Sequence, residues 1–238
     1  MNGFLYGAAL QWKLDLRSRT MLITCYAVPL LFFAVMGGIF TSVMPESKDT
    51  LIQSMTVFAV TMGALIGLPP SLVEIYKSDV KNAYRANGVP LSLGLILTNL
   101  SAFVHLLIMS FILYGTAPIA FGAKRPEHPG IYFGGLMILI AVSLSVASII
   151  GLAVKDTANT SMFSILLFLP SVVLSGIMFP AYLLPKSFET AGKLFPAAWG
   201  YRLMMENAFT GRTLWPLIII FLVAMVLCGM LLKKIKTR

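Results

Sequence analysis

The stretch that decides the fold reads Ser175-Gly176-Ile177-Met178-Phe179-Pro180-Ala181-Tyr182-Leu183-Leu184-Pro185. It overlaps the end of an uncharged apolar run over residues 161–179 and leads into two short segments, 187–195 and 199–209. A transmembrane helix needs about 20 apolar residues, and each short segment offers about half that number. Proline ends helices, and three prolines separate these segments: Pro180, Pro185 and Pro196. The pattern predicts a membrane-spanning helix followed by short helices that enter the bilayer only partway.

These short helices fall within residues 180–211, which we interpret as a re-entrant segment. Irregular backbone at membrane depth is tolerated only where protein buries it or water fills a cavity. We therefore expect the segment to pack against other helices near the mouth of a pathway. The alternative is an ordinary amphipathic loop that lies among the lipid headgroups.

The composition indicates an all-α integral membrane protein, because 58% of the 238 residues are hydrophobic and only 11% are charged. Six apolar runs predict six transmembrane helices, at about 21–44, 50–73, 91–116, 131–154, 161–179 and 214–232. These runs leave no room for a soluble domain of ordinary size, so residues 1–238 form a single membrane domain. Cys25 and Cys228 both fall inside predicted spans, where buried, unreactive thiols are expected.

Residues 1–19 place Phe4, Ala8 and Trp12 one helical turn apart, with polar side chains largely on the other faces. This pattern predicts an interfacial amphipathic helix with Trp12 at the headgroup level and its basic residues toward water. A disordered amino terminus is the alternative.

The net charge of +9 arises from Lys and Arg residues that flank the apolar runs, so topology explains it better than nucleic-acid binding. If both termini are cytoplasmic, the inner segments carry 11 Lys and Arg residues and the outer segments carry 7. The positive-inside rule therefore predicts a multi-pass protein of the cell membrane with both termini in the cytoplasm.

Residues 74–89 form a polar stretch between two predicted spans, with charged residues on one side of a helical wheel and apolar residues on another. The sequence Asn87-Gly88-Val89-Pro90 is a typical helix stop. A short amphipathic helix in this position needs a surface on which to dock. A solvated, positively biased loop that only sets the topology is the alternative.

His105 is the one ionisable residue deep in a predicted span, which makes it a possible pathway residue. A neighbouring Ser, Thr or Asn could instead satisfy a neutral imidazole. Arg202 and Glu206 are four residues apart and could pair across one helical turn. Phosphate-binding glycine loops, zinc-protease motifs and paired carboxylates within spans do not occur in the sequence, so we expect no catalytic residues and no metal site.

The chain resembles the permease subunit of type-2 ATP-binding-cassette exporters. The resemblance rests on the pattern Ser-Gly-x-x-Phe-Pro-x-x-x-Leu-Pro and, after it, x-Pro-x-x-Trp. The signature residues here are Ser175, Gly176, Phe179, Pro180, Pro185, Pro196 and Trp199.

In that family the fifth span is followed by a re-entrant pair of outer helices, and the stretch between spans two and three is a coupling helix that docks on the ATPase. The ending Gly88 to Ser92 fits the family, whereas only Glu74 remains of its usual beginning. The resemblance implies ATPase contacts from residues within 74–89, for which we select Glu74, Tyr76, Lys77, Val80, Tyr84 and Arg85.

The resemblance also implies that two permease subunits, identical or sister chains, pair above two ATPase subunits that hold ATP and Mg²⁺. This chain itself binds no cofactor. The exported substrate could be a drug or antibiotic, an antimicrobial peptide, or a lipid or glycan precursor. A secondary transporter working alone and a membrane enzyme or scaffold are the remaining alternatives.

Overall fold

The computed structural model describes residues 3–77, 80–154, 156–178, 185–206 and 208–237. Helices make up 87% of the chain, and no strand occurs among these residues. In chain order the elements are α1 (Gly3–Arg17), α2 (Arg19–Leu22), η1 (Ile23–Ala27), α3 (Val28–Val43), η2 (Pro45–Asp49), α4 (Leu51–Met62), η3 (Gly63–Gly67), α5 (Leu68–Lys77), α6 (Val80–Ala86), α7 (Leu91–Phe121), α8 (Pro129–Ala153), α9 (Thr157–Val173), α10 (Lys186–Gly192), α11 (Pro196–Met205) and α12 (Gly211–Thr237).

Among the residues that the structure describes, five helices are long and apolar enough to cross a membrane. They are Arg19–Val43, Leu51–Lys77, Leu91–Phe121, Pro129–Ala153 and Gly211–Thr237. Each corresponds to one of the predicted spans, so five of the six are confirmed as helices of sufficient length. The helix at the predicted fifth span, α9, has 17 residues and is about 26 Å long at 1.5 Å per residue. Its crossing of the membrane stays a prediction.

The first two spans stay helical where they contain proline, because each has a π turn just before the proline that makes room for its ring. Pro29 would clash with the carbonyl of Cys25, which lies in the π turn η1. Pro69 would clash with the carbonyl of Leu65, which lies in the π turn η3. A π turn widens the helix locally and shifts these carbonyls. Each span therefore continues through its proline, and the distortion lies in the π turn that precedes the proline.

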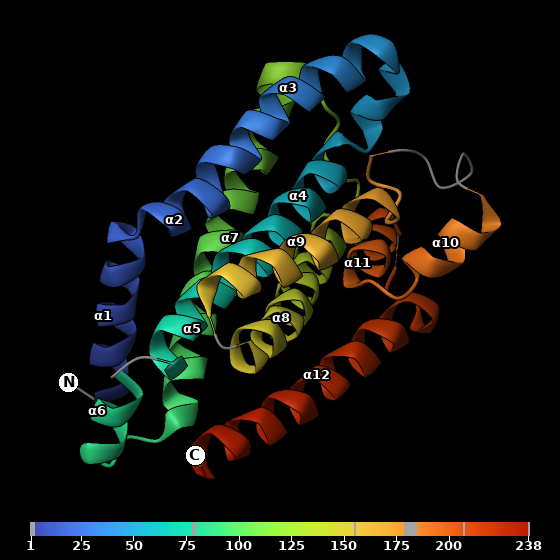
Figure 1. Cartoon of the computed structure of the whole chain (residues 1–238). Helices are drawn as coiled ribbons and strands as arrows, with labels where there is room; N and C mark the ends of the chain where they lie inside the picture. The colour runs from blue at the N-terminus through green and yellow to red at the C-terminus, as the bar shows by residue number, and fades with distance from the viewer. Residues whose placement is uncertain (1–2, 78–79, 155, 179–184, 207, 238) are drawn as a thin grey trace.

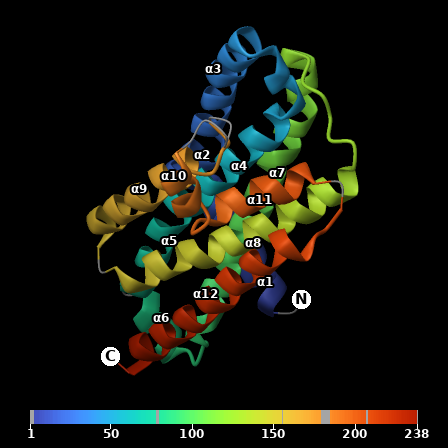
Figure 2. The same cartoon turned by 90° about the vertical axis from the view of Figure 1, so that its right-hand side faces the viewer.

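The helix formed by α4, η3 and α5 is the centre of the bundle, and every residue of its stretch 51–65 is buried. The helices α3, α7, α8 and α9 pack on it (Figures 1 and 2). The last helix, α12, is the least buried span and packs mainly on α8, which also contacts α5 and α11. The chain therefore has one central helix and a peripheral last helix.

The first turn of α1, α6 and the last turn of α12 lie at the same end of the bundle, here called the terminal end (Figure 1). The opposite, distal end holds η2 and the segment between α7 and α8. The ammonium of Lys124 and the carboxylate of Asp49 form an ion pair there at 3.0 Å, and the Lys124 N–H donates to the carbonyl of Lys48 at 2.9 Å. These contacts join the two distal connections.

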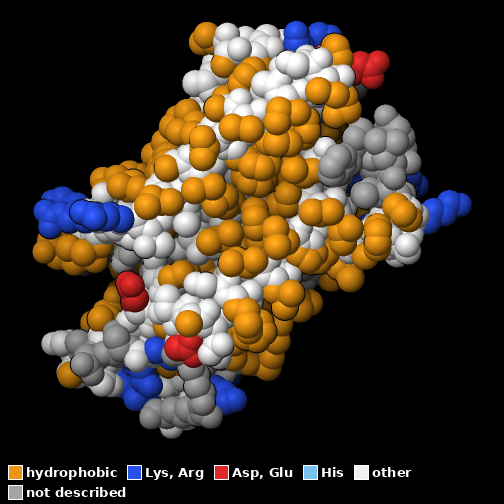
Figure 3. Space-filling view, turned by 45° about the horizontal axis from the view of Figure 1, so that its top comes forward, with side chains coloured by type: hydrophobic (Ala, Val, Ile, Leu, Met, Phe, Trp, Pro, Cys, Tyr) orange, Lys and Arg blue, Asp and Glu red, His pale blue; other side chains and the backbone are white. Residues whose placement is uncertain are grey.

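Hydrophobic side chains cover the middle of the face seen in Figure 3, and charged side chains gather at its edges. Exposed large apolar residues are numerous on α12, including Trp215, Ile219, Leu222 and Val226. A soluble monomer rarely exposes so large an apolar surface. Together with the long apolar helices, this surface identifies a multi-pass membrane protein.

The basic residues of the first helix are exposed as predicted, since Lys13 and Arg17 both face outward. The acidic residue Asp15 is only 4% exposed, because α1 packs against α7. The apolar residues Leu5 and Leu14 are also exposed.

Candidate functional site

The residues expected in one coupling helix over 74–89 belong to two helices. Glu74, Tyr76 and Lys77 form the last turn of α5, and Val80, Tyr84 and Arg85 lie in α6. Ser78 and Asp79, between them, lie outside the described residues. The separate helix in this stretch is therefore shorter than we expected, at Val80–Ala86.

The predicted helix stop at Gly88 is confirmed. Gly88 has a φ of +66°, a left-handed conformation that side chains with a Cβ rarely adopt. The Val89 N–H donates to the Tyr84 carbonyl at 2.9 Å, and the Gly88 N–H donates to the Arg85 carbonyl at 3.2 Å. This pair of bonds is the Schellman motif, which satisfies carbonyls that a helix end leaves free.

Tyr76 is 1% exposed, so its side chain is occupied within the chain. Its hydroxyl donates to the Leu91 carbonyl at the start of α7. Tyr84 is half-buried, and its ring lies against Gly94 of α7. By contrast, Val80 is 42% exposed. We therefore remove Tyr76 from the surface available to another subunit, because only an exposed side chain can make such a contact.

Two basic residues of this region bind the carboxyl ends of other helices. The Arg85 guanidinium donates from Nη2 to the carbonyls of Ile235 and Lys236, at 2.7 and 2.6 Å, in the last turn of α12. The Lys77 ammonium donates to the Leu152 carbonyl at 3.1 Å, in the last turn of α8. Carbonyls at helix ends lack partners within the helix and carry partial negative charge. Sequence alone could not assign these contacts, because the acceptors are 75 or more residues away.

His105 is fully buried and lies beside two aromatic residues that the sequence did not place there. Its Nδ1 is 2.8 Å from the Tyr26 hydroxyl, and its ring stacks on Trp12 with 4.1 Å between the ring centroids. The expectation that Ser, Thr or Asn would satisfy the imidazole was wrong for Nδ1, since a tyrosine does so. A role for His105 in lining a pathway stays a prediction.

The signature stretch ends α9 and forms a turn. Gly176 has a φ of +87°, which explains the glycine, and the Ser175 hydroxyl donates to the Val172 carbonyl at 2.8 Å. Pro185 immediately precedes α10 and Pro196 is the first residue of α11. Phe179 and Pro180 lie outside the described residues.

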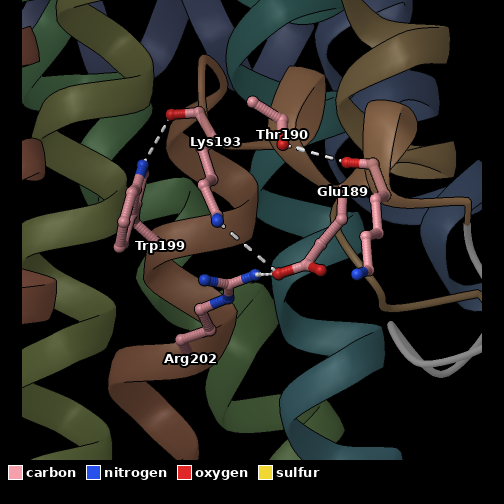
Figure 4. A network of polar contacts seen from close by, with 6 residues as sticks. Glu189, Thr190, Lys193, Trp199 and Arg202 are labelled. Carbon is pink, nitrogen blue, oxygen red and sulfur yellow. Dashed lines mark hydrogen bonds and ion pairs between the residues drawn. The ribbon is translucent and has the colours of Figure 1, made fainter.

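The two short helices predicted after this turn are present as α10 and α11, with 7 and 10 residues. Neither is long enough to span a bilayer. They join through a polar network shown in Figure 4, in which Trp199 Nε1 donates to the Lys193 carbonyl at 2.7 Å. Glu189 accepts from Arg202 at 3.3 Å and pairs with Lys193 at 3.6 Å. Whether this helix pair enters the bilayer stays a prediction.

The proposed pair between Arg202 and Glu206 was wrong, because α11 ends at Met205 and Glu206 has an extended backbone. Arg202 binds Glu189 and lies over the Trp199 ring instead, 5.4 Å from its centroid. Glu206 accepts hydrogen bonds from the hydroxyls of Thr210 and Thr213, at 2.7 and 3.0 Å.

The signature turn lines a cavity of about 530 Å³ at the distal end. Its other walls come from α3, η2, the start of α4 and Tyr201 of α11. Its lining is mixed. Apolar side chains include Phe40, Leu51 and Met178, and polar groups include Glu46, Ser47, Thr50 and Ser54. Such a lining suits an amphipathic molecule, and the volume is within the range of small-molecule pockets.

Among the described residues, no group of three or more His, Cys, Asp or Glu side chains lies together. Cys25 and Cys228 are free and buried, as the sequence predicted.

Comparisons with known proteins agree with this architecture. The sequence matches the family described as ABC-2 type transporter over residues 4–209. A search of curated proteins gave no match. The matched range includes the first four spans, α6, α9 and both short helices, so it covers most of the chain. The chain belongs to the ABC-2 type transporter family and is a membrane-spanning permease component.

Proposed function

We propose that this chain is the permease subunit of an ATP-driven exporter for amphipathic substrates. Family membership implies an ABC ATPase partner. The observation that supports a docking site for this partner is α6, a separate short helix at the terminal end of the bundle (Figure 1). It exposes Val80, Asn82 and Arg85, so it offers an apolar side chain and polar groups to a partner. ATP hydrolysis takes place in that partner.

In the assembled transporter, two permease chains, identical or sister, pair above two ATPase subunits. The chain lies in the cell membrane with the terminal end in the cytoplasm, which agrees with the distribution of Lys and Arg. ATP shifts the permease between states only to the extent that it binds those states with different affinity. When the ATPase subunits close, their movement acts on the permease through α6.

The contacts of α6 and of the end of α5 suggest which helices move when the ATPase displaces α6. Arg85 joins α6 to the end of α12, and Lys77 joins the end of α5 to the end of α8. Since α8 and α12 also pack on each other, displacement of α6 moves these two helices together. The distal cavity supports an amphipathic substrate, because apolar walls and hydroxyl groups face the same space. A drug or antibiotic, an antimicrobial peptide and a lipid or glycan precursor all have this character.

The docking of the ATPase is tested by Val80→Asp, which places a carboxylate on the exposed face of α6. We expect the affinity for the ATPase subunit to fall at least about tenfold, or about 1.4 kcal/mol, because the charge loses solvation at the interface. The measurement is association of the purified ATPase with permease in nanodiscs. The matched control is Val43→Asp, since Val43 is 72% exposed at the distal end of α3. Equal association of both variants and the unmodified chain would contradict the placement of the ATPase at α6.

A further inference from the structure

A buried polar cluster lies where α1 packs against α7. Asp15 of α1 is only 4% exposed, and His105 of α7 is fully buried. Trp12, one turn before Asp15, stacks on the imidazole with an angle of 11° between the rings. Tyr26 of η1 contacts the same ring through its hydroxyl. The cluster therefore joins three elements, and the function proposed for α6 does not involve it.

The cluster is unusual because three of its buried polar atoms have no hydrogen-bond partner. They are Oδ2 of Asp15, Oγ of Ser101 and Nε2 of His105. Asp15 Oδ1 accepts a hydrogen bond from Gln11 Nε2 at 3.0 Å, but an amide does not neutralise a carboxylate. Burying an ionised carboxylate without a cation is costly, and in practice such a group takes up a proton. The unpartnered Oδ2 of the buried Asp15 therefore points to a bound proton.

The surrounding elements provide no buried cation for Asp15 among their described residues. On α1 and α2 the basic residues are Lys13, Arg17 and Arg19, and all three are exposed. On η1 the titratable groups are Cys25 and Tyr26, which are neutral when protonated. The stretch 51–67 of the central helix has no charged or titratable residue, and the other such group on α7 is Tyr114, nine residues beyond His105. The described residues of these elements therefore leave the buried carboxylate without a buried Lys or Arg partner.

We infer that Asp15 carries a proton while α1 is packed on α7 and that this bound proton secures α1 on α7. With the proton bound, the buried cluster is neutral, and Trp12 stacks on its imidazole. Without it, an uncompensated carboxylate stays buried and favours separation of α1 from α7. This inference concerns how α1 is held, so it does not depend on the export assignment.

The direction of the pH dependence follows from linkage. Burial raises the pKa of Asp15, against smaller opposing effects of Ser101, Gln11 and the charge of His105. An undocked α1 would return Asp15 to water, where its pKa is about 3.9. Between these two pKa values the docked state binds more protons than the undocked state. The free energy of docking therefore weakens as the pH rises through that window.

Trp12 provides a direct measure of docking. The chain has 3 tryptophans, so the variant Trp199→Phe/Trp215→Phe leaves Trp12 as the single tryptophan, whose emission can be excited selectively over that of the tyrosines. We would measure acrylamide quenching of Trp12 in detergent-solubilised protein between about pH 4 and pH 8. The quenching constant is expected to rise at least about twofold with pH, because an undocked Trp12 is exposed to the quencher.

Asp15→Asn in this background tests the role of the carboxylate. The amide imitates the protonated form, so quenching should stay low and become independent of pH. The matched control is Asp156→Asn, which removes an exposed carboxylate at the start of α9 while keeping a residue that can cap the helix. It should retain the pH profile of the background protein. A flat profile in the background protein, or an unchanged profile in Asp15→Asn, would overturn the inference.

Discussion

Gly151 allows α8 to approach α5 closely. A Cβ atom at this position would lie 2.7 Å from the Leu72 Cβ and 3.0 Å from the Pro69 carbonyl oxygen. Backbone and Cβ atoms cannot rotate away, so Gly151→Ala forces the two helices apart. Overpacking of this kind typically costs about 1–3 kcal/mol. We expect this loss in the free energy of unfolding, measured by denaturant titration in mild detergent.

Gly229→Ala on α12 is the matched control, because a Cβ at that position meets no atom within 4 Å. Alanine favours helix over glycine by up to about 1 kcal/mol, so this variant should be as stable as the original chain or slightly more stable. If Gly151→Ala were as stable as Gly229→Ala, the close contact between α8 and α5 would be incorrect.

Single polar residues show where sequence reasoning ends. The spacing of Phe4, Ala8 and Trp12 correctly predicted a helix, since periodicity depends on neighbours in the sequence. The side of that helix facing the protein was not predictable in the same way. Asp15 is buried because Ser101 and His105, some 90 residues later, form its surroundings. Their proximity depends on the packing of α1 on α7, which no local pattern records.

At the level of the element, α6 is held to α12 by one side chain. Arg85→Ala removes both hydrogen bonds to the last carbonyls of α12. A hydrogen bond from a charged donor contributes about 1.5–3 kcal/mol to stability. Because Arg85 is exposed, we expect the contribution of its hydrogen bonds to lie at or below the lower end of this range. We expect the amides in the last two turns of α12 to exchange about tenfold faster, as measured by hydrogen–deuterium exchange.

The control for this change is Lys81→Ala, which removes a cation from α6 without removing a contact to α12 that the structure shows. Exchange near Ile235 should then match that of the original chain. If Arg85→Ala left this exchange unchanged, the last turn of α12 would not depend on α6. The coupling path from α6 to α12 in our proposed function would then lose its physical basis.

The prolines illustrate what an element's sequence can and cannot predict. Proline lacks a backbone N–H, so a span that continues through Pro29 or Pro69 needs a local distortion, and the structure has one in each. Its form, a π turn one turn before the proline, depends on how the displaced carbonyls find donors and on packing. The stop at Gly88 was predictable, because a left-handed residue is a local requirement. The division between α5 and α6 was not.

For the whole molecule, apolar runs were sufficient to predict the helical class and five long spans. Length and hydropathy are properties of the sequence alone, so these features need no tertiary information. The central position of the α4–α5 helix was not predictable, because its neighbours were unknown. The number of crossings is the remaining question, and it depends on α9.

Two observations support a crossing by α9 although it has only 17 residues. It begins just after the end of α8, where Lys77 of the terminal end binds Leu152. It is followed by Gly176 and Met178, which line the distal cavity beside η2. The residues that follow Val173 add to the length of chain that can cross the bilayer. A short helix can also be accommodated by local thinning of the bilayer. We therefore propose six crossings, with α9 as the fifth.

Cysteine labelling tests this arrangement, because Cys25→Ala/Cys228→Ala provides a background without thiols. In this background we would introduce Asn159→Cys at the start of α9 and Lys186→Cys at the start of α10, both exposed positions. Glu127→Cys and Lys236→Cys serve as references for the distal and terminal ends. A membrane-impermeant maleimide should label Lys186→Cys and Glu127→Cys in intact cells, but the other two only after permeabilisation. If Lys186→Cys instead behaved like Asn159→Cys while Lys236→Cys was labelled in intact cells, α9 would not cross, and the chain would have five spans with termini on opposite faces.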